Sequence, residues 1–250
     1  MKPNLIKALL LVLSAPWIPK SMEDQPDENK YSTVAEIPLP PGYSRIAETD
    51  KSFGAWLRNL RLKKDKRIFL FNGQLKPDQD MQFAVIDLPI GRKNLQQCAD
   101  VVMRLRADYL KSQERWQEIR FTDNNGNQYA PRHHADDIEW QKWLELVFAR
   151  CGTLSLQKQL KVVKGLSYCS IGSVLIQGGM PGHAMIIVDM AENKAGKKIY
   201  LLAQGYMPAQ DIHIVINPKD TGLSPWYELE NGRVITPGWV FPEGSFRIWD

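Results

Sequence analysis

Cysteine is scarce in this sequence, and an excess of one charge is missing from most of it. The 250 residues include only Cys98, Cys151 and Cys169, so at least one thiol stays unpaired in any disulfide scheme. Without the lysines of the first 21 residues, basic and acidic residues are nearly equal in number. A balanced charge gives no reason to expect nucleic acid as a partner. With 44% apolar residues and no low-complexity tract, the chain suits one domain with a sizeable core.

Apolar runs long enough to cross a bilayer comfortably are also missing. The first 21 residues have a basic start and a short apolar core at 8–13, which is typical of a secretory signal. Pro16 directly follows the small residues at the expected cleavage site, so the segment could instead stay as an anchor. We therefore expect export to the periplasm or the exterior, with membrane contact only through this segment.

The remainder divides into a linker and one domain. Residues 22–40 begin acidic and poor in apolar residues and end in a proline-rich stretch, which predicts an extended linker. Residues 41–250 mix strand-like and helix-like patterns, and we expect a single α+β domain there. The sequence does not determine an oligomeric state.

The centre of this domain carries a predicted β-hairpin. Two apolar, β-branched runs at 184–190 and 198–203 flank a polar segment that contains Asn193 and Gly196. These features indicate two antiparallel strands joined by a short loop.

A histidine opens the first strand of the hairpin, and a glutamine closes the second. With the loop flanked by Met190 and Lys197, the predicted register places His183 directly opposite Gln204. Directly opposed side chains are close enough for an amide to orient an imidazole. A histidine held in this way is half of a catalytic apparatus that also needs a nucleophile.

Cys98 is the best candidate for that nucleophile. Apolar residues at 95, 98, 102, 105 and 109 form a helical stripe, and Asn94 looks like the N-cap of a helix over 95–110. This places Cys98 near the first turn, where free N–H groups and the helix dipole favour the thiolate. The same stripe is equally compatible with Cys98 as a small core residue, and His183 alone is compatible with an ordinary strand-end histidine. Only the combination with Gln204 favours a site.

The order of Cys98, His183 and Gln204 resembles that of papain-like cysteine hydrolases. More narrowly, the segments S-I-G-S-V-L-I at 170–176 and G-H-A-M-I-I-V-D at 182–189 are similar to a strand pair of NlpC-like and CHAP-like cell-wall amidases and endopeptidases, with Ser173 where those enzymes carry aspartate. Over nearly the whole exported part, the chain also resembles an uncharacterised family of secreted bacterial proteins known only as a domain of unknown function. The resemblance implies a papain-like α+β fold in which the helix carrying the cysteine packs on an antiparallel sheet.

The resemblance also implies a function, namely cysteine-dependent hydrolysis of an amide in the bacterial cell envelope. Cys98 would attack the carbonyl, His183 would transfer protons, and Gln204 would orient the imidazole. The substrate would be a cell-wall peptide or another amide, with no cofactor and no metal. For contacts with the substrate we expect Gln97, Asn72, Gly182, Tyr206 and Trp226.

Two other interpretations stay open. The same scaffold could be a non-catalytic module that binds envelope components. A metal-dependent hydrolase could instead be centred on His133 and His134 with Asp136 and Asp137, although these residues lack the helical spacing of a zinc-hydrolase motif. His213 lies in a regular alternation of polar and apolar residues, which favours a structural role.

Overall fold

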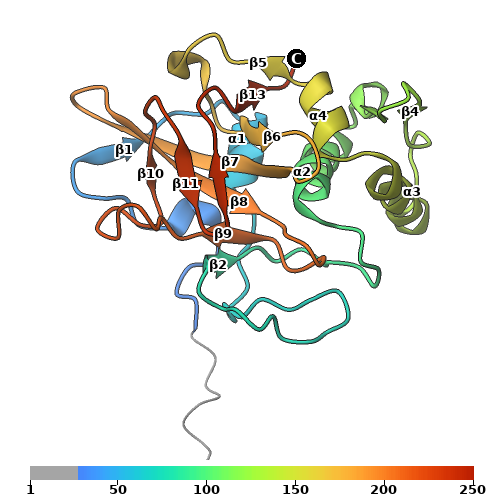
Figure 1. The fold of residues 1–250 in the computed structure, drawn as a ribbon, viewed down its shortest axis with the longest axis horizontal. Helices are drawn as coiled ribbons and strands as arrows, with labels where there is room; N and C mark the ends of the chain where they lie inside the picture. The colour runs from blue at the N-terminus through green and yellow to red at the C-terminus, as the bar shows by residue number, and fades with distance from the viewer. Residues whose placement is uncertain (1–27) are drawn as a thin grey trace, which may run out of the picture.

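Apolar runs in the second half of the chain form the centre of a nine-stranded antiparallel sheet (Figure 1). The computed structural model describes residues 28–250, so the predicted signal or anchor at 1–21 lies outside the described residues. The order along the sheet is β2-β9-β8-β7-β6-β13-β5, with β1 paired to β7 and β10 paired to β8. Its strands are β1 (Tyr43–Arg45), β2 (Gln82–Val85), β5 (Lys161–Val162), β6 (Val174–Gln177), β7 (His183–Asn193), β8 (Lys198–Gln204), β9 (His213–Val215), β10 (Tyr227–Glu228) and β13 (Phe246–Ile248).

The helices cover the sheet mainly near the start of β7. In Figure 1, α2, α3 and α4 lie together at the right-hand end of the sheet, and α1 lies behind its centre. They are α1 (Phe53–Arg58), α2 (Cys98–Ser112), α3 (Asp137–Arg150) and α4 (Thr153–Gln159), with short 3-10 turns η1 (Val34–Glu36), η2 (Trp116–Glu118) and η3 (Leu166–Tyr168). Two small sheets pair β3 (Phe121–Thr122) with β4 (Gln128–Tyr129), and β11 (Val234–Thr236) with β12 (Trp239–Phe241). The fold is therefore mixed α+β with a large antiparallel sheet, as predicted. No helix within residues 28–250 has the length and apolar character needed to cross a membrane.

The predicted hairpin is present as β7 and β8, but the register predicted for it is wrong. The structure pairs Glu192 with Lys198 and Ile186 with Ala203, and a bulge lies between Ile187 and Asp189. The connecting turn is tighter than predicted because the Asn193 side chain accepts hydrogen bonds from two backbone N–H groups within it. Consequently His183 and Gln204 are not directly opposite each other. They are diagonal neighbours, which long side chains can still bridge.

Helix α2 begins at Cys98 and not at residue 95. The N-cap is Gln97, whose backbone N–H donates to the Asp100 carboxylate at 2.9 Å. Asn94, the predicted N-cap, instead accepts a hydrogen bond from the backbone N–H of Ala209 at 2.8 Å. Asn94 therefore caps no helix, and its side chain instead binds a backbone segment distant in sequence. Because most of α2 is buried and contacts β7, its first turn has a fixed position against the sheet.

The folded domain starts earlier than the predicted boundary at residue 41. Val34 and Ile37 are fully buried, and Ser32 accepts a backbone hydrogen bond from Leu62 at 2.9 Å. From residue 28 onward, the segment predicted to be a linker therefore packs against the domain. The segment has few apolar residues, but Val34 and Ile37 lie entirely in the core and hold it against the domain.

A buried carboxylate joins this N-terminal part to the sheet. Asp189 in β7 has no exposed surface and accepts from Arg45 at 2.7 Å and from Arg58 at 2.5 Å. Two guanidinium groups compensate the cost of burying one carboxylate. They connect β1 and α1 to the central strand.

Candidate active site

Cys98 and His183 line the same cleft. This cleft has a volume of about 540 Å³ and lies where the start of α2 meets the start of β7 and the segment after β8. Cys98 is the first residue of α2, His183 is the first residue of β7, and Gln204 is the last residue of β8. The three predicted positions in these elements are confirmed.

Cys98 is partly exposed as a residue, whereas Cys151 and Cys169 are buried. Burial is the main influence on its pKa and raises it above the ordinary value, although a hydrogen bond from the Ala184 backbone acts in the opposite direction. That bond brings the sulfur beside the residue that follows His183. Backbone N–H groups of Cys98 and Ala99 at the helix start lower this pKa, as predicted, but desolvation outweighs them, so the thiol and not the thiolate is favoured overall in the free protein.

His183 is packed among aromatic rings and is only 2% exposed. Its ring centroid lies 5.1 Å from that of Tyr206, 5.3 Å from Trp239 and 5.7 Å from Phe241. Burial lowers the pKa of His183 to about 4, although a hydrogen bond to Gln204 acts in the opposite direction. At neutral pH the imidazole is therefore uncharged and available as a base.

A chain of hydrogen bonds fixes which nitrogen of His183 carries the proton. The Nδ1 group of His213 faces the backbone oxygen of Asp211 at 2.9 Å, and because a carbonyl only accepts, this nitrogen must carry the hydrogen. Burial lowers the pKa of His213 to about 4, so the ring is neutral and its Nε2 accepts. The Gln204 amide Nε2 donates to it at 3.0 Å.

The carbonyl Oε1 of Gln204 is then directed at His183 Nε2, at 2.7 Å. This oxygen accepts, so His183 Nε2 carries the hydrogen and Nδ1 keeps its lone pair. Asp211, His213 and Gln204 together hold His183 in the tautomer whose Nδ1 can take up a proton. The structural role predicted for His213 is thus also a role at the site.

The structure brings only part of the predicted substrate contacts to the cleft. Gln97, Gly182 and Tyr206 line it, whereas Asn72 and Trp226 do not. Asn72 is exposed and pairs with Gln74 in a turn. Trp226 is 1% exposed and donates through Nε1 to the Pro38 backbone oxygen. Its aromatic turn belongs to the core, so these two predictions need correction.

Several residues at the cleft were missed. Trp239 lines the cleft and packs against His183, the buried Phe241 also packs against His183, and Asn94, Phe148, Leu154 and Met207 also line the walls. The aromatic turn at 237–241 was a visible signal in the sequence, but nothing in the local pattern connects it to His183. That contact depends on the packing of β12 against β6, where Trp239 Nε1 donates to Gln177 Oε1 at 3.3 Å.

Close packing at Gly182 sets the position of His183. A Cβ atom at this residue would lie 2.4 Å from Thr153 Oγ1 and 2.6 Å from the Gly179 oxygen. Only glycine fits between α4 and the preceding turn. The Thr153 hydroxyl also donates to the Gly179 oxygen at 3.2 Å.

The alternative metal site has no support in the structure. Within residues 28–250, no group of three or more His, Cys, Asp and Glu side chains could hold a metal ion. Asp136 caps helix α3 by accepting from the backbone N–H groups of Ile138 and Glu139. His134 packs its ring against Trp116, with 5.6 Å between centroids.

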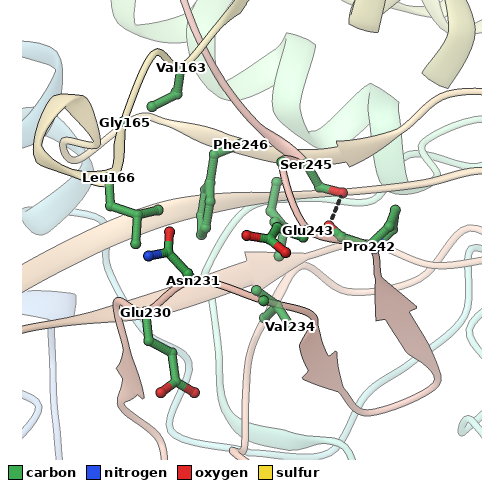
Figure 2. Close-up of a pocket in the computed structure, with 13 residues that line it drawn as sticks. Val163, Gly165, Leu166, Glu230, Asn231, Val234, Pro242, Glu243, Ser245 and Phe246 are labelled. Carbon is green, nitrogen blue, oxygen red and sulfur yellow. Dashed lines mark hydrogen bonds between the residues drawn. The ribbon is translucent and has the colours of Figure 1, made fainter.

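A second pocket offers no comparable chemistry. Figure 2 shows this smaller space, of about 120 Å³, between the loops at 230–234 and 242–246 and the segment at 163–166. Its lining residues include Glu230 and Glu243 but neither cysteine nor histidine. The Ser245 hydroxyl donates to the Pro242 oxygen at 2.6 Å, and among the described residues no histidine lines this pocket to act as its base. The cleft at Cys98 therefore stays the candidate site.

Comparison with known proteins identifies a family but no activity. No curated protein and no solved structure matches this chain. A family model matches residues 34–136 and 128–247, which is most of the chain and includes Cys98, His183, Gln204 and His213. The chain therefore belongs to the family described as Domain of unknown function (4846), as its sequence predicted.

Proposed function

We propose that this protein is a cysteine-dependent amide hydrolase with a papain-like, NlpC-like arrangement of its site. The observation that carries the proposal is the 2.7 Å hydrogen bond between His183 Nε2 and Gln204 Oε1, at a cleft that Cys98 also lines. This bond leaves His183 Nδ1 with its lone pair, and His183 and Cys98 both line the cleft. A helix-start cysteine, a strand-start histidine and an amide on the next strand match the order expected of papain-like hydrolases.

In the first step the Cys98 sulfur attacks the amide carbonyl carbon while its proton passes to His183 Nδ1. The C–N bond then breaks as His183 gives that proton to the departing amine. A thioester between Cys98 and the acyl group remains. Water, deprotonated by His183, then attacks the thioester, which releases the carboxylic acid and restores the thiol.

The start of α2 offers donors for the oxyanion that forms during attack. The backbone N–H of Cys98 belongs to the first turn, whose N–H groups have no partner within the helix. The side chains of Gln97 and Asn94 lie at the same wall of the cleft. Asn94 takes the place that the sequence assigned to Asn72, because Asn72 lies elsewhere.

The resting pair is a neutral thiol and a neutral imidazole. Burial raises the pKa of Cys98 and lowers that of His183 to about 4, so a preformed thiolate–imidazolium pair is disfavoured. Proton transfer therefore accompanies attack on the substrate. Alkylation by iodoacetamide at neutral pH is then a poor test of this site, because it depends on the thiolate of the free protein.

We further propose that the enzyme acts in the bacterial cell envelope on a cell-wall peptide or another amide. This setting depends on the N-terminal segment at 1–21, whose pattern predicts export. Oligomeric state does not enter the proposal, because the residues assigned to the site all come from one chain.

The test is acylation of Cys98 by an activated ester. With 4-nitrophenyl acetate at pH 7, we expect a burst of nitrophenolate and an acetyl thioester on the peptide that contains Cys98, detected by mass spectrometry. Cys98→Ala should abolish both. His183→Ala should slow acylation by about 10²- to 10⁴-fold, because general-base catalysis contributes that much.

Cys169→Ala is the matched control, since Cys169 is a buried thiol outside the cleft, and it should acylate like the wild type. If Cys98 is acetylated equally fast in His183→Ala, the thiol reacts without help from His183 and the proposed catalytic pair is wrong. The absence of any adduct would leave the non-catalytic envelope-binding module as the better interpretation.

A further inference from the structure

The walls of the cleft carry almost no charge. Among the described residues that line it, none is lysine, arginine or glutamate, and His183 is the only histidine. The one acidic residue is Asp100, which is 6% exposed and accepts from the Gln97 backbone through Oδ2. Burial raises the pKa of Asp100 to about 8, so this carboxyl group is also uncharged at pH 7.

Apolar side chains occupy the mouth of the same cleft. Met180 is fully exposed, Met207 is 68% exposed and Leu154 is 39% exposed, and all three line the cleft. Phe148 and Leu95 continue this surface between α2 and α3. Large apolar groups left in water beside a cleft mark a binding surface, and methionine adapts to apolar ligands of different shape.

A negatively charged substrate would find no partner at these walls. Recognition of a carboxylate generally uses arginine or lysine, which pair with it directly. The sequence contains 32 lysine and arginine residues, but none of the described residues that line the cleft is one of them. Desolvating a carboxylate here would cost free energy without compensation.

We propose that the acyl part of the substrate is an uncharged apolar chain, bound along Leu154, Met180 and Met207 with its carbonyl at Cys98. This inference depends on the proposed function for its chemistry, and it narrows the substrate class. Amides with an apolar acyl chain fit the cleft, whereas cell-wall peptides with a free carboxylate next to the cleaved bond do not. The volume of about 540 Å³ lies within the range of small-molecule sites.

The test measures kcat/KM for acylation of Cys98 by a series of 4-nitrophenyl esters. From acetate through butyrate and hexanoate to octanoate, we expect a rise of at least about tenfold, because each buried CH₂ group favours binding. The hemiglutarate ester has a free carboxylate and nearly the same length as the pentanoate ester. It should react at least about tenfold more slowly than pentanoate, since its charge has no partner in the cleft.

A matched pair of variants locates the effect. Leu154→Arg places a cation at the cleft, so the preference for octanoate should fall and the hemiglutarate ester should react faster than with the wild type. Leu146→Arg changes a similarly exposed leucine that does not line the cleft, and it should behave like the wild type. The two positions are 39% and 44% exposed, so either arginine can reach water.

The outcomes separate this inference from the proposed function. Cys98 could be acylated at a rate that does not depend on chain length, or faster by the hemiglutarate ester than by pentanoate. Either result would contradict the apolar substrate but not the enzyme proposal. If no ester acylates Cys98, binding of octanamide to the Cys98→Ala protein is measured by calorimetry. Saturable binding that Leu154→Arg weakens supports the apolar site without catalysis, and absence of binding overturns it.

Discussion

At the scale of single residues, the orientation of Gln204 is the least obvious feature of the site. Its amide can point either its oxygen or its nitrogen at His183, and only the oxygen leaves His183 with a basic Nδ1. His213 selects this orientation, because its Nδ1 donates to the Asp211 backbone oxygen and its Nε2 must therefore accept from the Gln204 nitrogen. His213 does not line the cleft, so we regard it as a positioning residue.

Replacing His213 tests this role. In His213→Phe the Gln204 amide loses its acceptor. We expect kcat for ester hydrolysis to fall by about 10- to 100-fold, which is typical when a residue that orients a functional side chain is removed. KM should change little, because His213 does not contact the cleft. Stopped-flow acylation and steady-state kinetics on one ester provide both constants.

His213→Gln supplies the control for this change. Its side-chain oxygen can accept from Gln204, so it should recover part of kcat. Thermal unfolding of both variants separates positioning from simple damage. If the two variants lose the same activity in proportion to their loss of stability, His213 has only a structural role.

At the scale of elements, the site depends on how closely the start of α2 approaches the end of β8. Gly205 follows Gln204, and a Cβ atom there would lie 2.6 Å from Val101 Cγ2 and 3.0 Å from the Gln97 oxygen. The missing side chain therefore lets the first turn of α2 pack directly on the strand end. The register of β7 and β8 then brings His183 to the same place.

Gly205→Ala should separate these two elements. We expect a loss of about 1–3 kcal/mol in the free energy of unfolding, typical of overpacking, because Gln97 contributes backbone atoms that cannot rotate away. Acylation of Cys98 should slow by more than the stability change alone explains, since the displaced turn carries the nucleophile. Urea unfolding and the ester burst measure the two effects.

Gly165→Ala is the comparison for this change. The nearest atom to a Cβ at Gly165 is Ser167 Oγ at 4.0 Å, and the residue has no positive φ. It should be nearly neutral in both measurements. If Gly205→Ala were equally neutral, α2 could shift freely and the close approach would not determine the site.

At the scale of the whole molecule, two buried histidines couple stability to pH. His183 is 2% exposed and His213 is fully buried, and burial lowers the pKa of each to about 4 from an ordinary value of 6.5. Between these values the unfolded chain binds more protons than the folded protein. Each histidine therefore reduces the free energy of unfolding as the pH falls from about 6.5 to about 4.

The size of this effect can be isolated with His213→Gln. Between pH 7 and pH 4.5 one such histidine costs about 2–3 kcal/mol of stability, from the pKa shift and linkage. The pH dependence of the wild type alone does not isolate the histidines. Burial raises the pKa of Asp100 to about 8, so this group increases the free energy of unfolding as the pH falls. Urea unfolding at both pH values should show that the variant loses about 2–3 kcal/mol less than the wild type. Parallel pH dependences would mean that His213 is not held neutral.

The sequence by itself determined the α+β class, the family, a helix with Cys98 near its start and the strand ends that carry His183 and Gln204. These features are local, because periodicity and turn residues act over a few positions along the chain. The hairpin register failed because a bulge and the tight turn at Asn193 shift the pairing, and neither changes the apolar pattern of the strands.

Only the tertiary structure decided the partners and the charge states of the site. His213 reaches Gln204 through the pairing of β9 with β8, and Trp239 and Phe241 reach His183 through tertiary packing of their hairpin, which no local pattern encodes. The pKa values of Cys98 and His183 follow from burial, and burial depends on what the rest of the chain places around them. For the same reason Asn72 and Trp226, which looked suitable in the sequence, lie away from the cleft.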